Sequence, residues 1–193
     1  DDGDPELFVE AGGDMVTAKR GSTTGGRLYR EPKGFSLQQF AALPGELAAI
    51  YDDCRACYPN EACGYVLRRD GVLTTVVAQN VQDRYHSLDP TTYRRTARTA
   101  FKLNEMKIAR ALESGAELVC IYHSHCDAGA YFSNEDVECA LLDGKPLFPG
   151  VSYLVVSVYG GDLKAAELYA FDTEQGTYAP QKHPAMAALV QTR

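Results

Sequence analysis

The sequence contains no apolar run approaching the roughly 18 residues that a membrane-spanning helix needs, and no signal-peptide pattern at its start. Basic residues are also in short supply, since 19 Lys and Arg stand against 26 Asp and Glu and give a net charge of −7. Phosphate recognition needs a local surplus of Lys and Arg, so this balance disfavours a general nucleic-acid or acidic-membrane binder. The sequence therefore predicts a soluble protein that binds neither nucleic acid nor membrane.

A disulfide framework is not required for folding. The 193 residues are 45% apolar, and a domain of this size can bury a sizeable core without covalent cross-links. Buried cysteines often act as small hydrophobic residues, which fits Cys120 in an apolar run and Cys139 in an Ala/Leu-rich stretch. The spacing of Cys54 and Cys57 is that of a redox or zinc pair, but no second pair of matching spacing exists, which favours helix packing. We expect reduced thiols and a cytoplasmic protein.

Three regions differ in composition. Residues 1–34 hold seven of the 17 glycines and show no sustained hydrophobic period, so we expect a flexible arm or linker there. A folded domain is expected over residues 35–180, followed by a C-terminal tail over residues 181–193.

The hydrophobic pattern of the folded part mixes helices with adjacent strand pairs. Helical spacing predicts helices near residues 43–54 and 134–142, and Asp89-Pro90 predicts the start of a long helix that ends near Ser114. Strands are predicted at residues 64–68, 72–77, 118–122, 153–158 and 165–171. This order favours an α+β or three-layer α/β fold with a central mixed sheet flanked by helices.

The residues with the clearest chemistry follow the predicted strand at 118–122. His123 and His125 point to the same side of an extended backbone, and two imidazoles at a strand end are a natural half of a zinc site. Asp136 would supply a third ligand if the intervening loop folds back. Each part also has a purely structural interpretation, since Ser133 and Asp136 have a capping-box-like spacing that can simply start a helix.

The complete pattern resembles the JAMM (MPN+) zinc metalloprotease family. His123, His125, Ser133 and Asp136 match its His-x-His-x7-Ser-x2-Asp signature, and Glu61 lies in the family's Pro-x-Glu-x-Cys-Gly context. The resemblance extends over about residues 43–171 and is strongest to short bacterial-type members. It implies a cytidine-deaminase-like fold, with one zinc ion held by the two histidines and the aspartate. Glu61 would then act as general base and acid, and Ser133 would stabilise the oxyanion.

The resemblance also implies a substrate. It indicates a peptidase or isopeptidase that cleaves after the C-terminal Gly-Gly of a small ubiquitin-like or sulfur-carrier protein. The main alternative is a catalytically inactive MPN scaffold that binds protein partners. A zinc deaminase is disfavoured, because that class pairs His-x-Glu with Pro-Cys-x-x-Cys.

Four features remain open. Cys126 stands where the family commonly has proline, either as a harmless turn residue or as a thiol that competes for zinc or senses oxidation. In the predicted long helix, Arg94, Arg98 and Lys102 share one face, which is either solvated or in contact with substrate. The turn-rich loop at residues 143–150 is a candidate substrate contact, and His86 is assigned to local structure.

Overall fold

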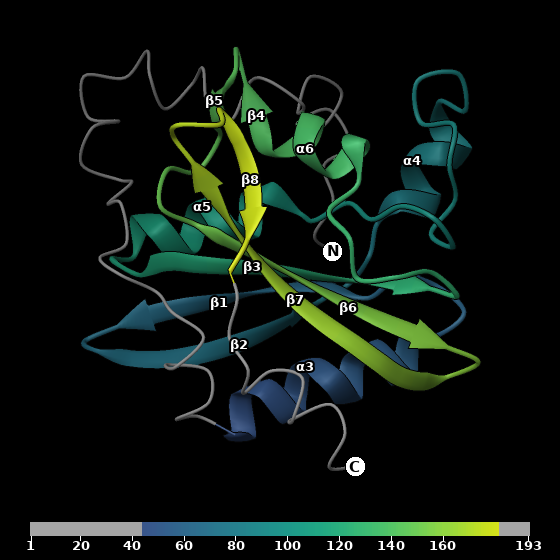
Figure 1. Cartoon of the computed structure of the whole chain (residues 1–193), viewed down its shortest axis with the longest axis horizontal. Coiled ribbons are helices and arrows are strands. Elements are labelled where there is room, and N and C mark those ends of the chain that lie inside the picture. Colours follow the sequence, from purple (N-terminus) through teal and green to yellow (C-terminus); the bar gives the residue numbers. More distant parts are fainter. Residues whose placement is uncertain (1–43, 182–193) are drawn as a thin grey trace.

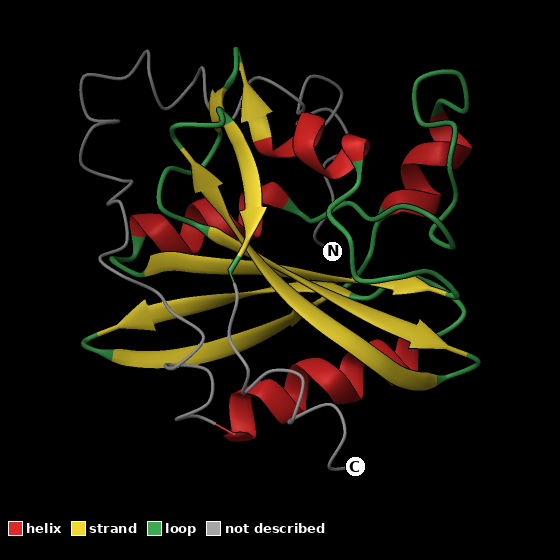
Figure 2. Ribbon diagram, in the orientation of Figure 1, coloured by secondary structure: helices red, strands yellow, loops and turns green. Residues whose placement is uncertain are grey.

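The computed structural model describes residues 44–181. The predicted arm at residues 1–34, the expected start of the folded domain near residue 35 and nearly all of the predicted tail lie outside the described residues. Figures 1 and 2 show a twisted sheet with helix α3 on one face and helices α5 and α6 on the other. The helices are α3 (Pro44–Cys57), α4 (Gln82–Leu88), α5 (Glu105–Glu113) and α6 (Asn134–Ala140). The strands are β1 (Cys63–Arg69), β2 (Val72–Ala78), β3 (Glu117–Cys126), β4 (Leu141–Leu142), β5 (Lys145–Pro146), β6 (Ser152–Tyr159), β7 (Asp162–Asp172) and β8 (Thr177–Pro180).

The sheet is mixed. Its strand order is β2-β1-β3-β6-β7-β8, in which β3 and β6 run parallel and every other neighbouring pair is antiparallel. The central strand β3 is buried along most of its length, as its continuous apolar sequence predicts. The α+β class and the sheet flanked by helices are thus confirmed.

Each face of the sheet has its own hydrophobic core. On one face, Leu47 and Ile50 of α3 pack with Tyr122 of β3. On the other face, Ile108 and Leu112 of α5 pack with Ile121 of β3. Successive residues of a strand point to opposite faces, so every second residue of β3 counted from Ile121 faces α5. Those residues include both histidines of the motif.

The strand β1 lies unusually close to its neighbours at Gly64. A Cβ atom added there would lie only 2.4 Å from the Tyr122 ring and 2.4 Å from the Val76 carbonyl oxygen, which is a steric clash. Only glycine fits between these two groups, which explains the glycine in the motif that contains Glu61. The close approach brings the chain just before β1 alongside the end of β3, where Ser124 accepts from the Ala62 N–H at 2.8 Å.

The predicted long helix from Asp89 to Ser114 is wrong in its first part, and only its last part, Glu105–Glu113, is helical as α5. Asp89 does cap a turn, since its Oδ1 accepts from the N–H groups of Thr91 and Thr92 at 3.2 and 3.1 Å. The turn does not continue, and the chain runs irregularly to Asn104, which caps α5 by accepting from the Met106 N–H at 3.1 Å. Arg94, Arg98 and Lys102 therefore do not share a helical face.

Side chains from the preceding segment hold this irregular stretch in place. The amide of Asn80 donates to the carbonyl oxygens of Glu61 and Ala100, at 2.9 and 3.0 Å, and its oxygen accepts from the Lys102 N–H at 3.0 Å. Asp83 accepts from the Ala97 N–H at 2.7 Å. These bonds satisfy backbone groups that a helix would otherwise pair internally, so the stretch is stable without helical structure.

The other predicted elements are present with shifted boundaries. The hairpin between β1 and β2 turns at Asp70-Gly71, both of which have positive φ, as its sequence predicts. The pattern did not indicate β8 or the short β4–β5 hairpin. None of the helices within residues 44–181 has the length and apolar character that a bilayer crossing requires.

Candidate metal centre

The strand β3 presents both histidines of the motif on the face that α5 covers. His123 is fully buried and His125 is 6% exposed. His123 pairs with Cys63 of β1 on one side and with Val155 of β6 on the other, so its backbone position is fixed by two neighbouring strands. The rings therefore emerge from the rigid centre of the sheet rather than from a loop.

Helix α6 supplies the carboxylate. Its first turn is closed by a capping box, in which the Ser133 hydroxyl oxygen accepts from the Asp136 N–H at 3.0 Å. In return, Oδ2 of Asp136 accepts from the Ser133 N–H at 2.9 Å. The capping interpretation and the ligand interpretation are thus compatible, since the same oxygen that closes the helix start also faces the histidines.

Three donor atoms converge at this point. Nε2 of His123 lies 3.2 Å from Nε2 of His125 and 3.2 Å from Oδ2 of Asp136, and the remaining pair is 3.5 Å apart. Ligands at about 2.0–2.1 Å from a tetrahedral zinc ion stand roughly 3.3 Å from one another. Among the described residues, these three form the single group of His, Cys, Asp and Glu side chains with spacing suited to a metal ion. The set therefore fits a zinc ion.

Hydrogen bonding fixes the tautomer of His125. Its Nδ1 lies 2.8 Å from the Gly129 carbonyl oxygen, which only accepts, so Nδ1 carries the proton and Nε2 offers a lone pair to the shared point. The ring of His123 is held differently, because Phe101 stacks on it with ring centroids 4.3 Å apart. Burial lowers the pKa of His123, which keeps that imidazole neutral and suited to metal binding.

Asp136 stays ionised despite partial burial. Burial alone would raise the pKa of its carboxyl group, but the adjacent imidazoles of His123 and His125 and the hydrogen bond from the Ser133 N–H outweigh burial and hold the pKa well below its usual range. In the metal-binding state, two neutral imidazoles and one carboxylate would carry a total charge of −1, which favours a divalent cation between them.

Glu61 lies beside this group at the end of the loop that precedes β1. Its N–H donates to the Ala97 carbonyl oxygen at 2.7 Å, and its side chain is buried with 6% exposed. Burial raises the pKa of Glu61 to about 8; His125 and Arg95 oppose this rise, and Asp136 adds to it. A buried carboxyl group that titrates near neutrality is suited to exchanging protons.

The raised pKa of Glu61 makes the stability of the metal-free protein depend on pH. The carboxyl group ionises near pH 4.5 in the unfolded protein but near pH 8 in the folded protein. The free energy of unfolding therefore falls by up to about 1.4 kcal/mol for each pH unit between these two values. Glu61→Gln removes that loss. The variant should gain stability relative to the original protein as pH rises from 5 to 8, as measured by urea unfolding of both metal-free proteins. If the difference between their free energies of unfolding stayed constant with pH, Glu61 would not be buried as described.

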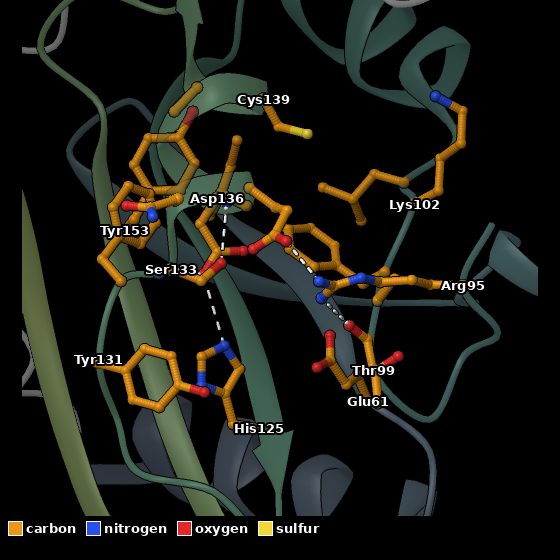
Figure 3. A pocket seen from close by; sticks show the side chains of 18 of the residues that line it. Glu61, Arg95, Thr99, Lys102, His125, Tyr131, Ser133, Asp136, Cys139 and Tyr153 are labelled. Carbon is orange, nitrogen blue, oxygen red and sulfur yellow. Dashed lines mark hydrogen bonds and ion pairs between the residues drawn. The ribbon is translucent and has the colours of Figure 1, made fainter. Parts of the chain in front are cut away.

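Two of the three candidate ligands, His125 and Asp136, border a cavity of about 640 Å³ (Figure 3). Glu61 and Arg95 lie on one side of it, and Tyr131, 55% exposed, packs beside His125 on the other. The lining also includes Ser133 and Asp136, together with Leu147 and Phe148 from the loop that was predicted to contact substrate. That loop therefore does reach the cavity.

The structure also clarifies the other open features. All six cysteines are free, and Cys54 and Cys57 belong to α3. Cys126 borders the cavity, and burial, reinforced by Glu61, raises the pKa of its thiol to about 11; the thiol does not belong to the group of three donor atoms with spacing suited to a metal ion. His86 serves local structure, with its Nδ1 2.7 Å from the Tyr93 carbonyl oxygen.

Two further residues at the centre were not anticipated from the sequence. Phe101 stacks on His123, and Arg95 forms an ion pair with Glu135 on α6. Both come from the stretch that was predicted to be helical, where no motif marks them. The available signal was the group of polar residues that precede this stretch, Asn80 above all, because their side chains hydrogen-bond its backbone in place of helical hydrogen bonds.

One known protein family matches most of the described part of the chain. The family described as prokaryotic homologs of the JAB domain matches residues 45–171. No curated protein gives a significant match. The solution structure of protein DSY2949 from Desulfitobacterium hafniense is 19% identical with a TM-score of 0.48, and the match covers 72% of this chain and 86% of that one. A protein from Salinibacter ruber, also solved in solution, is 26% identical with a TM-score of 0.45 over the same shares. The family match spans well over half of the sequence, so the chain belongs to the JAB/MPN family as one of its prokaryotic homologs.

Proposed function

We propose that the protein is a zinc-dependent peptidase or isopeptidase that cleaves after the C-terminal Gly-Gly of a small ubiquitin-like or sulfur-carrier protein. The observation that carries the proposal is the convergence of His123, His125 and Asp136 beside the buried carboxyl group of Glu61. The JAB family includes metalloproteases, and this donor set is of the kind that catalytic zinc sites use with one position left open.

The residues around the metal position have complementary roles. A zinc ion held by the three side chains would act as a Lewis acid and lower the pKa of a water molecule to about 7. Glu61 would accept the proton of the attacking water and return it to the leaving amine. Its buried position keeps bulk water from competing for that proton.

Ser133 is placed to stabilise the developing oxyanion. The oxygen of its hydroxyl group already accepts from the Asp136 N–H, so the hydroxyl proton remains free to be donated toward the cavity. A preorganised donor of this kind stabilises the negative charge that forms on the scissile carbonyl oxygen.

The substrate class is supported by family membership and by the steric demands of the site. The amide to be cleaved must reach a centre bordered by Tyr131, Phe101 and Ser133. A tail that ends in two glycines enters such a site without side chains that would collide with the walls.

The test is to incubate the zinc-loaded protein with ubiquitin-like and sulfur-carrier proteins that carry C-terminal extensions beyond Gly-Gly. Mass spectrometry should show cleavage directly after the second glycine, and a chelator should stop it. Zinc binding without cleavage of any such substrate would instead favour the inactive scaffold, and cleavage at other positions would contradict the substrate class.

A further inference from the structure

One wall of the cavity carries three basic side chains, although the chain as a whole has a net charge of −7. They are Arg95, Arg98 and Lys102, from the irregular stretch between α4 and α5. Their surroundings decide which of the three can bind something that enters the cavity.

Two of the three already have partners. Arg95 forms an ion pair with Glu135, and it also donates to the Thr99 carbonyl oxygen at 3.4 Å, a contact that can be followed in Figure 3. The Lys102 ammonium group lies over the ring of Tyr85, 5.0 Å from its centroid, and 5.6 Å from that of Tyr93. Both cations are thus engaged by the protein itself.

Arg98 differs from both. It is exposed, and its side chain makes no hydrogen bond or ion pair within residues 44–181. Its positive charge acts through space on the Asp127 carboxylate, and also on the Cys126 thiol and the Tyr58 hydroxyl group. The oxygens of Asp127 already accept from the Tyr58 hydroxyl group at 2.9 and 3.1 Å and from the Gly160 N–H at 2.9 Å. The guanidinium group of Arg98 is therefore available to a bound anion.

The position of Arg98 relative to Glu61 indicates which part of a substrate it meets. Arg98 follows directly after Ala97, whose carbonyl oxygen accepts from the Glu61 N–H at 2.7 Å. This backbone hydrogen bond therefore holds the segment that carries Arg98 next to Glu61, the proposed proton donor to the leaving amine. Because Glu61 would protonate the leaving amine, the proposed function puts the leaving group on this side of the metal centre.

We propose that Arg98 is a specificity-determining residue that binds the carboxylate of a leaving group consisting of a single amino acid. This inference rests on the proposed function. In such a leaving group the carboxylate is one carbon atom away from the amine that Glu61 protonates, whereas in an isopeptide-linked lysine it lies a whole side chain further off. A guanidinium group pairs well with a carboxylate and poorly with a neutral amide.

The kinetic test uses two forms of one substrate, a ubiquitin-like protein that ends in Gly-Gly-Ala with either a free carboxylate or a C-terminal amide. The zinc-loaded protein should cleave the carboxylate form with a kcat/KM about tenfold higher or more. Arg98→Gln should abolish this preference while leaving cleavage of the amide form nearly unchanged. Arg94→Gln is the matched control, since Arg94 lies outside the cavity lining and its side chain donates to the Thr91 carbonyl oxygen.

A binding measurement separates this inference from the proposed function. Alanine and alaninamide are titrated into the metal-free full chain, and the amide signals of residues near Arg98 are followed by NMR. Alanine should bind about fivefold tighter or more, and the difference should vanish in Arg98→Gln but persist in Arg94→Gln. Binding of this kind without any cleavage would sink the peptidase proposal and leave the carboxylate site standing. Equal cleavage of both substrates together with equal binding of both ligands would overturn the role of Arg98 and leave the peptidase.

Discussion

Replacement of Glu61 by Gln is expected to slow hydrolysis about 10²–10⁴-fold while the zinc content of the protein stays the same. Gln has nearly the same shape as Glu but cannot accept a proton, and Glu61 does not belong to the group of three donor atoms. Single-turnover cleavage of a Gly-Gly-extended substrate gives the rate, and atomic absorption gives the zinc content.

Glu138→Gln is the matched control for this substitution. Glu138 is exposed and lies on α6 two residues beyond Asp136, and it does not line the cavity. The substitution removes the same negative charge as Glu61→Gln. The Glu138→Gln variant should cleave the substrate at the same rate as the original protein. A Glu61→Gln variant that retained full activity would show that the proton is carried by another group, and the proposed roles would then have to be reassigned.

The parts of the fold that the sequence predicted are those that local pattern determines. Strand β3 is an apolar run that is buried on both faces, and the hairpin at Asp70-Gly71 has residues suited to positive φ. The capping box at Ser133 likewise depends only on residues three positions apart. In each case the interactions that fix the structure lie within a few residues or repeat along a strand.

The stretch after Asp89 could not be predicted in this way. Its capping residue and its later apolar positions are typical of a helix, and the competing hydrogen bonds come from Asn80 and Asp83. Whether those side chains reach the backbone of Ala97 or Ala100 depends on the three-dimensional path of the chain. The positions of Phe101 and Arg95 at the metal centre follow from that path, so they too were missed.

In the candidate site, too, some residues could be predicted from local pattern and others depend on long-range contacts. The two histidines on one strand face follow from the alternation of an extended chain, but Glu61 was assigned through the family resemblance alone. The structure shows what holds the Glu61 segment near the histidines, because Ser124 lies between the two histidines and accepts a hydrogen bond from the N–H of the residue after Glu61. This contact joins segments that are 62 positions apart, and no local pattern contains it.

Replacement of Asp136 by Asn is expected to weaken zinc binding by at least about 100-fold and to abolish hydrolysis without unfolding α6. The carboxylate provides the negative charge in the donor group, and a neutral amide oxygen is a much weaker ligand for zinc. Asn can still accept from the Ser133 N–H, so the first turn of the helix remains closed. Competition with a chromophoric chelator measures the affinity, and circular dichroism reports the helix.

Ser133→Ala separates loss of the ligand from loss of the cap. It removes the acceptor for the Asp136 N–H and should cost about 1 kcal/mol of stability, yet it leaves all three donor atoms in place. This variant should therefore keep one zinc ion per chain, while Asp136→Asn loses it at the same chelator concentration. If both variants lost zinc equally, the rigidity of the helix start would control metal binding. If neither did, the ion would have to be held elsewhere, and the geometry at the end of β3 would no longer support a hydrolase.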